Sequence, residues 1–364
     1  MLDIKTLGAG GGSIAWVDEG GGLQVGPQSA GADPGPACYA RGGALPTVTD
    51  ANLLLGFLNA GYFADGELML SVDQARAAIE RHVAQPMGLQ AQEAAEGILR
   101  VAEAVMMRGI RLVSVERGYD ARQFCLFCFG GAGPTHAVRL AHALEISKIV
   151  VPASPGVNCA LGLLMADFRH DYSRTLLGRL AGLKPELLSS VFRNLEAAAG
   201  AQMDAEGVSE EIVFRRSADV RYAGQGYELN LPLRGGDYAH ADLQSMCLAF
   251  GDAHTSLYGY ALSSSAVELV NVRLAAFGML AKPRLARQSV SEEDPSSARK
   301  GTRQVYLEGE YHAVPIYDRG RLKCGNMILP PAIVEQPDTT TLVLMGYLAR
   351  VDHYRNLVLT KELG

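Results

Sequence analysis

The spacing of apolar residues along the chain predicts several helices that each bury one face. In residues 71–83 and 90–115, apolar side chains recur three and four positions apart, which is the period of an amphipathic helix. The same spacing recurs in residues 185–206 and 242–258. Residues 50–56 begin a further helix, and their aspartate at the start is a candidate N-cap.

A strand–helix–strand unit is predicted between these helices. Residues 124–129 are uniformly apolar, which predicts a strand buried on both faces. A glycine-rich turn at 130–134 and a helix at 135–144 follow it. A second apolar strand at 148–151 ends at Pro152. The unit has the length of a right-handed parallel crossover, so an α/β fold is expected here.

The pattern changes in the second half of the chain. Alternation in residues 213–231 and 267–274 predicts strands, residues 284–299 are polar and suit a linker, and residues 302–360 are rich in short strands. We therefore expect three segments. They are an α/β domain at 1–175, an α+β region at 176–284, and a linker with a small β-rich module at 285–364.

Composition narrows the class of protein. The net charge of −6 argues against a nucleic-acid binder, which would carry a basic patch. No apolar run reaches the roughly 18 residues of a membrane span, and the N-terminus does not resemble a signal peptide. Six cysteines in 364 residues form no disulfide scaffold, so a cytoplasmic protein is expected. Cys125 and Cys128 lie on an apolar strand without a second pair, which favours core residues over a metal site.

Two glycine clusters are the candidate ligand-binding segments. Residues 8–13 could bind an anion, because consecutive glycines let backbone N–H groups converge. Residues 130–134 follow a strand, where ligands gather in α/β folds. Both clusters are equally compatible with purely structural turns. His136, at the start of the next helix, is either a catalytic group or a packed residue.

Several longer motifs resemble one known family. Similarity to the hydantoinase A/5-oxoprolinase family is carried by residues 8–16, 25–39, 47–52, 129–137, 155–162, 169–172, 221–229 and 331–341. The resemblance implies a partial actin/Hsp70/sugar-kinase-like (ribonuclease H-like) lobe, followed by α+β and β-rich parts. It also implies ATP and Mg²⁺ as cofactors and a small cyclic amide as substrate. The implied function is that of part of an ATP-dependent hydantoinase/5-oxoprolinase-type amidohydrolase, in which phosphorylation activates the amide oxygen.

The resemblance also implies which residues form the site. Catalytic candidates, chosen because they lie inside matching motifs, are Asp50 and His136. Residues implied to line the nucleoside end of the ATP cleft are Gly130, Gly131 and Gly133. Residues implied to lie near the active centre are Gly10, Gly11, Gly12 and Ser13. The sequence assigns no metal ligand.

The chain also departs from the family pattern. Neither of the family's two Asp-Gly-Gly-Thr phosphate loops occurs, and the lobe that carries the first of them is expected to precede Leu2. We therefore expect an inactive fragment when isolated. It would require its N-terminal lobe in trans or from a second copy, and a hydantoinase B-type subunit. Two alternatives remain, which are a non-catalytic assembly module and a subunit of an ATP-dependent acetone- or acetophenone-type carboxylase.

Overall fold

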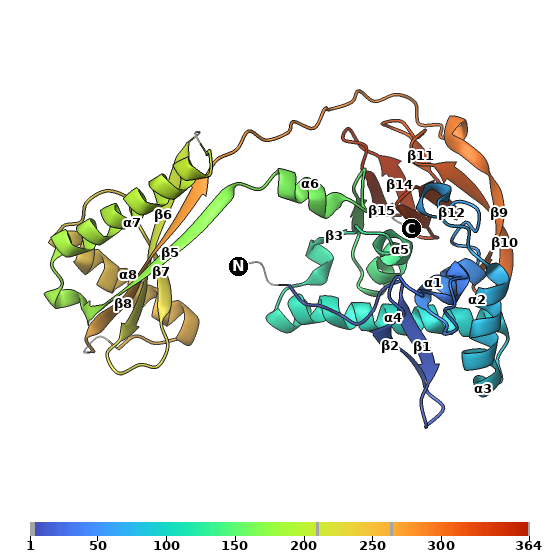
Figure 1. Ribbon diagram of the computed structural model, residues 1–364, viewed down its shortest axis with the longest axis horizontal. Helices are drawn as coiled ribbons and strands as arrows, with labels where there is room; N and C mark the ends of the chain where they lie inside the picture. The colour runs from blue at the N-terminus through green and yellow to red at the C-terminus, as the bar shows by residue number, and fades with distance from the viewer. Residues whose placement is uncertain (1–3, 209–210, 263–264, 363–364) are drawn as a thin grey trace. The chain divides into compact units, whose positions relative to one another are not determined.

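The chain folds into two compact units, and its last segment returns to the first unit. The computed structural model of the protein describes residues 4–208, 211–262 and 265–362. Unit 1 combines residues 1–161 with residues 285–364, and unit 2 comprises residues 162–284. In Figure 1 the blue N-terminal hairpin and the red C-terminal strands accordingly belong to the same unit.

This arrangement differs from the expected separate module at 285–364. The last strand, β15, pairs with β4 in the register Leu357↔Val151 to Thr360↔Lys148. The β-rich segment therefore completes a sheet begun more than half a chain earlier. Short apolar strands predict a sheet, but they do not specify which distant strand is their neighbour.

Unit 1 contains three sheets. Their strand orders are β1-β2, β13-β12-β10-β9 and β11-β14-β15-β4-β3. The strands are β1 (Ser13–Val17), β2 (Leu23–Ser29), β3 (Cys125–Phe127), β4 (Lys148–Val151), β9 (Arg299–Leu307), β10 (Glu310–Asp318), β11 (Met327–Ile328), β12 (Ala332–Gln336), β13 (Thr339–Val343), β14 (Tyr347–Val351) and β15 (Leu357–Lys361). The helices are α1 (Val48–Leu54), α2 (Val72–Ile79), α3 (Gln85–Met87), α4 (Ala91–Val113), α5 (Gly133–Ala143) and α6 (Asn158–Leu164), of which α6 runs across the boundary to unit 2.

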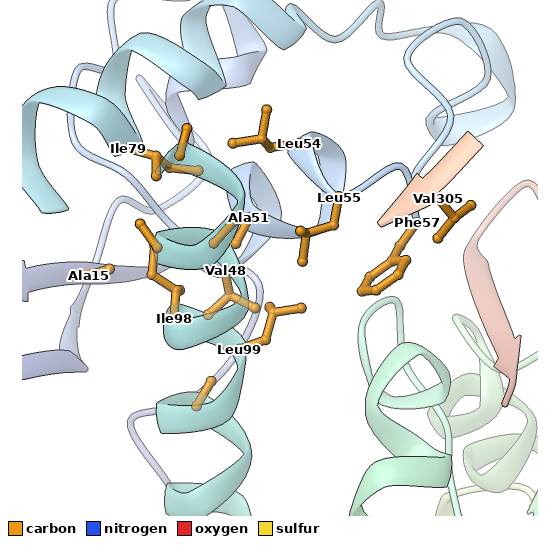
Figure 2. Close-up of a cluster of buried hydrophobic side chains, with 14 of the residues drawn as sticks. Ala15, Val48, Ala51, Leu54, Leu55, Phe57, Ile79, Ile98, Leu99 and Val305 are labelled. Carbon is orange, nitrogen blue, oxygen red and sulfur yellow. The ribbon is translucent and has the colours of Figure 1, made fainter. Parts of the chain in front are cut away.

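The helix predictions for this unit hold, and they explain its main core. The 90–115 pattern becomes α4, whose buried face includes Ile98 and Leu99. Figure 2 shows these side chains facing those of α1 and of Phe57. Val305 of β9 joins the same cluster, so the C-terminal sheet shares a core with the N-terminal helices. Burial of such side chains contributes roughly 1.5–3 kcal/mol each.

The apolar strand at 124–129 is not buried as predicted. Within this segment only β3 is a regular strand. It is the end strand of the five-stranded sheet, and among the described residues it pairs with β4 alone. Cys128 is buried, but Phe124, Phe127 and Phe129 are 51%, 48% and 43% exposed. One face of β3 therefore packs on the core, whereas the other is open and apolar.

Unit 2 is an antiparallel sheet with two long helices. The strand order is β5-β8-β6-β7, and every pairing is antiparallel. The elements are β5 (Phe168–Arg179), α7 (Pro185–Ala205), β6 (Ile212–Tyr222), β7 (Leu229–Leu233), α8 (His240–Tyr258) and β8 (Val267–Gly278). Both helices contribute to one apolar cluster with the sheet, which includes Phe192 and Phe250. The helix and strand patterns predicted for 185–274 are confirmed.

A buried carboxylate ties the C-terminal sheet together. Glu335 of β12 is 3% exposed and accepts hydrogen bonds from Lys300 (2.8 Å) and Arg303 of β9, which lies on the far side of β10. Asn59, after α1, also donates to it (3.4 Å). Burial alone would raise the pKa of Glu335, but hydrogen bonds from the two cations outweigh burial and hold that pKa below its ordinary value.

We expect Glu335→Gln to lower the free energy of unfolding by about 2 kcal/mol at neutral pH, because Lys300 and Arg303 lose their partner in a partly buried site. The folded-state pKa of Glu335 lies below its unfolded-state value. Its stabilisation is therefore complete above the unfolded-state pKa and is lost as the pH falls through the folded-state pKa. Urea unfolding at neutral and acidic pH measures both effects. The exposed control Glu310→Gln should change stability by less than about 0.5 kcal/mol. If the difference in unfolding free energy between the parent protein and Glu335→Gln were as large in acid as at neutral pH, this account would be wrong.

Candidate functional site

A pocket of about 310 Å³ in unit 1 brings the two glycine clusters together. One wall consists of Gly11 and Gly12 with Thr49 and Asn52 of α1. A second wall consists of Gly131, Ala132 and Thr135 at the start of α5, and a third is the turn 336–340 between β12 and β13. Three segments that are far apart in the sequence therefore meet at one site.

The first wall is held by hydrogen bonds between the glycine loop and α1. The carbonyl of Gly11 accepts from both the backbone N–H and the hydroxyl of Thr49, each at 2.9 Å. Ser13 closes the loop, because its hydroxyl accepts from Gly10 N–H (2.9 Å) and donates to the Gly8 carbonyl (3.2 Å). A Cβ at Gly11 would lie 2.9 Å from the Thr49 hydroxyl, so glycine permits this close approach.

The second and third walls are clamped to each other. Thr339 donates its hydroxyl to the carbonyl of Gly131 (2.7 Å), and Thr135 donates its hydroxyl to the carbonyl of Thr340 (2.8 Å). Asp338 accepts from the backbone N–H of Gly156 (2.6 Å). These bonds fix the hairpin turn against the start of α5 and thereby close the pocket.

The start of α5 forms one end of the pocket. Helix α5 begins without a side-chain cap at Ala132 and without an acidic residue in its first turn. Its first N–H groups and its dipole therefore favour a negatively charged or electron-rich ligand group. The lining residues include no Lys, Arg or His, and Asp338 is their only charged side chain.

Aromatic rings form another part of the lining. Tyr39, Tyr62 and Phe63 all border the pocket, and the rings of Tyr39 and Phe63 lie 5.9 Å apart at an angle of 50°. Such rings offer flat apolar surface to a planar ligand. The site thus combines glycine N–H groups, threonine hydroxyls and aromatic faces, which suits a ligand with a planar part and a polar part.

Asp50 is next in sequence to the lining residue Thr49, but its side chain is bound entirely by other parts of the fold. Its carboxylate is fully buried and accepts four hydrogen bonds, from the backbone N–H groups of Ala37 (3.3 Å), Cys38 (2.7 Å) and Thr47 (2.8 Å) and from the Thr47 hydroxyl (2.7 Å). It is not the N-cap that the sequence predicted. Thr47 is the N-cap, and Asp50 is the third helical residue of a capping box.

His136 is likewise buried away from the lining. Its Nδ1 lies 3.1 Å from a carboxylate oxygen of Glu103 on α4, which also accepts a 3.4 Å hydrogen bond from Arg139. Its Nε2 is buried and has no hydrogen-bond partner in the part of the chain that the structure describes. This arrangement joins α5 to α4.

The predicted binding residues divide into two groups. Gly11, Gly12 and Gly131 line the pocket, whereas Gly10, Ser13, Gly130 and Gly133 belong to the same loops but not to the lining. Lining residues that were not predicted as site residues are Tyr39, Thr49, Asn52, Leu58, Tyr62, Phe63, Ala64, Ala132, Thr135 and the turn at 336–340. Most of them lie inside the motifs that resemble the family, and only that resemblance could have pointed to them as site residues. Leu58, Tyr62, Phe63 and Ala64 lie outside these motifs, so nothing in the sequence pointed to them.

The described residues can also be searched for metal ligands and for membrane-spanning helices. Among the described residues, no group of three or more His, Cys, Asp or Glu side chains could hold a metal ion. Cys128 is buried as expected for a core residue, and burial raises the pKa of its thiol to about 12, but Cys125 is exposed. Of the described helices, none is long and apolar enough to cross a membrane.

Both the mixed α/β fold and the sequence of this chain are similar to those of known proteins. The hydantoinase/oxoprolinase family matches residues 1–172, and its C-terminal domain matches residues 183–362. The chain belongs to the hydantoinase/oxoprolinase family. It spans about half the length of the curated relatives it matches.

Two relatives and one structure of similar fold accompany this match. An uncharacterized protein of Methanocaldococcus jannaschii is 42% identical over 97% of this chain and 50% of its own length. The crystal structure of the ATP-dependent caprolactamase from Pseudomonas jessenii is 34% identical, with a TM-score of 0.81 over 100% of this chain and 53% of that one. Nucleotide-free acetone carboxylase shares the fold, with a TM-score of 0.83 at 24% identity over 97% of this chain and 52% of its own.

We expect Asp50→Asn to lower the free energy of unfolding by at least about 2 kcal/mol, because an amide nitrogen would face backbone donors inside the protein. Thermal and urea unfolding followed by circular dichroism measure the loss. Asp33→Asn is the matched control, since Asp33 is exposed in the loop that precedes α1 and does not take part in this network. If Asp50→Asn were as stable as the parent protein but inactive in the assembled enzyme, Asp50 would be catalytic and not structural.

Proposed function

We propose that this chain is one part of an ATP-dependent amidohydrolase of the hydantoinase/5-oxoprolinase type, and that its pocket receives the nucleoside end of ATP. The observation that carries the proposal is the convergence of Gly11, Gly12 and Gly131 on one pocket. These residues come from the two loops for which the sequence implied nucleotide contacts. In this proposal the surrounding part of unit 1 is one lobe of an actin-like fold.

The pocket suits part of a nucleotide better than a whole one. Its volume of about 310 Å³ is at the lower end of the range for small-molecule sites. Tyr39 and Phe63 offer a stacking surface to a base. The uncapped start of α5 favours the negative charge of a first phosphate group.

ATP would phosphorylate the amide oxygen of a cyclic amide and so convert it into a better leaving group, with Mg²⁺ neutralising the transferred charge. The role of this chain is to hold the base and ribose and to fix the direction in which the phosphates leave the pocket. Because the lining has no Lys, Arg or His, we assign most phosphate and Mg²⁺ contacts to another polypeptide.

Two kinds of partner belong to this proposal. The relatives are about twice as long as this chain, so a polypeptide equivalent to their other half would complete the ATP site. The open apolar face of β3, with Phe127 and Phe129, is a surface that such a partner would cover. A second copy of the chain is the alternative occupant. A B-type subunit is proposed because a relative is named as the alpha subunit of caprolactamase.

A ketone carboxylase is the second candidate function. It is favoured by the similarity in fold to acetone carboxylase and by 34% identity to the gamma subunit of an acetophenone carboxylase. Both reactions begin with activation of a carbonyl oxygen by ATP, so the same pocket would serve either. Turnover that requires bicarbonate would identify the carboxylase.

We expect the folded chain to bind Mg·ATP, and Gly131→Val to weaken that binding by about tenfold or more, since a side chain would occupy the pocket wall. The backbone of Gly131 tolerates the change, because the nearest atom to an added Cβ is the Asp338 carbonyl oxygen at 3.5 Å. Calorimetry measures binding and circular dichroism confirms folding. Gly200→Val, in open space on α7, is the control that should bind normally.

The activity test uses the chain mixed with the half of the Methanocaldococcus jannaschii relative that this chain lacks. ATP-dependent opening of caprolactam, 5-oxoproline or hydantoin supports the amidohydrolase. Absence of Mg·ATP binding by the folded chain, both alone and in this mixture, would leave the non-catalytic module as the better account.

A further inference from the structure

A second pocket of unit 1, the α4–α5 pocket, is bordered by α4, α5 and the hairpin of β9 and β10. Its volume is about 600 Å³, within the range of small-molecule sites, and it shares no lining residue with the pocket formed by the glycine loops. The apolar part of its lining consists of Leu99, Val138, Leu307, Pro331, Leu344 and Met345.

Charged residues of this lining lie at two separate places along α4. At one place, Glu308 in the turn of the hairpin donates its backbone N–H to the Glu96 carboxylate (3.1 Å). At the other, Arg139 of α5 donates to the Glu103 carboxylate (3.4 Å). Glu96 and Glu103 are seven residues apart on α4, so these two ends of the pocket are about 10 Å apart at the rise of an α-helix. Leu99 lies between them on the same face of the helix.

Arg139 retains hydrogen-bond donors that the fold does not use. Its Nη1 bonds Glu103, whereas its Nε and Nη2 make no hydrogen bond to any residue that the structure describes. The guanidinium lies over the ring of Phe57, 5.0 Å from the ring centroid, and the side chain is 26% exposed. An arginine with neighbouring unused nitrogens can bind a carboxylate through two parallel hydrogen bonds. His142, one turn further along α5, adds a ring nitrogen to this end of the lining.

Glu308 supplies an unused charge of the opposite sign. It is exposed and lines the pocket, and its carboxylate forms no hydrogen bond or ion pair within the described part of the chain. A carboxylate in this state can accept hydrogen bonds from an ammonium group. The α4–α5 pocket therefore offers donors for an anion at one end, an acceptor for a cation at the other, and apolar side chains in its lining.

We infer that the α4–α5 pocket binds a linear aliphatic amino acid whose two charged groups lie at opposite ends of the molecule. Arg139 binds its carboxylate and Glu308 binds its ammonium group. An α-amino acid carries both charges close together and so cannot reach both ends at once. Hydrolysis of a lactam ring releases a compound of the linear class, so under the proposed function this pocket would bind the reaction product. The binding itself does not depend on that function.

The test titrates the full chain with 6-aminohexanoate and follows the methionine methyl signals by NMR, because Met345 lines the pocket. Met345→Leu assigns the signal, which we expect to shift in a saturable manner. Three comparison compounds should bind at least about tenfold more weakly. Hexanoate and hexylamine each lack one charged group, and 2-aminohexanoate has the same atoms with its two charges adjacent.

Variants at the two ends should have different effects. Glu308→Gln should weaken binding of 6-aminohexanoate about tenfold, leave hexanoate binding unchanged and keep the melting temperature, since the Glu308 carboxylate has no partner in the described fold. Arg139→Gln should weaken binding of both compounds. Glu310→Gln is the matched control, because Glu310 lies in the same hairpin but not in the lining, and it should bind as the parent chain does.

Three results would overturn the inference. They are equal affinity for 6-aminohexanoate and 2-aminohexanoate, an undiminished preference for 6-aminohexanoate over hexanoate in Glu308→Gln, and no shift of the Met345 signal at millimolar 6-aminohexanoate. The Glu308 result decides even if Arg139→Gln does not fold. The titrations contain no ATP, so a failure of Mg·ATP binding would remove the proposed function and leave this inference standing.

Discussion

The candidate site depends on the clamp between the turn after β12 and the glycine-rich start of α5. Across this contact Thr339 donates its hydroxyl to the Gly131 carbonyl and Thr135 donates its hydroxyl to the Thr340 carbonyl. Asp338 accepts from the backbone N–H of Gly156. Without the clamp, the second and third walls of the pocket would be separate surface loops. Because the turn is carried on the sheet that Glu335 ties to β9, the C-terminal segment is a part of the site and not an appended module.

Of this clamp, the sequence predicted the glycine-rich turn at the start of α5, but neither the turn after β12 nor the contact between the two. The 3.6-residue period gave α4 and α7 with ends close to those observed, since a helix is specified by its own residues. The position of the turn at 336–340 depends on a contact with Gly131 across about two hundred residues, for which local pattern holds no information. Likewise Asp50 looked like an N-cap by type, yet Thr47 performs that role, and the Asp50 carboxylate organises the preceding loop.

The prediction that residues 124–129 form a strand buried on both faces is wrong, and the exposed face explains why. Their uniform hydrophobicity is that of a strand covered on both sides, but in the structure only the Cys128 side is covered. An end strand that exposes Phe127 and Phe129 and carries no charged or proline residue is poorly protected against association. In the described structure, the uniform hydrophobicity of residues 124–129 is therefore matched by burial on one face only.

Two buried polar residues of one short helix differ in whether the fold satisfies their hydrogen bonds. Asp50 and Asn52 are both buried polar residues of α1, and both lie in the same motif. The Asp50 carboxylate is saturated by four donors of its own chain, so its burial stabilises the fold. The Asn52 side-chain oxygen has no donor among the described residues, so its burial costs stability. Of the two residues, Asn52 is the one that lines the pocket, although the sequence motif alone favoured the carboxylate.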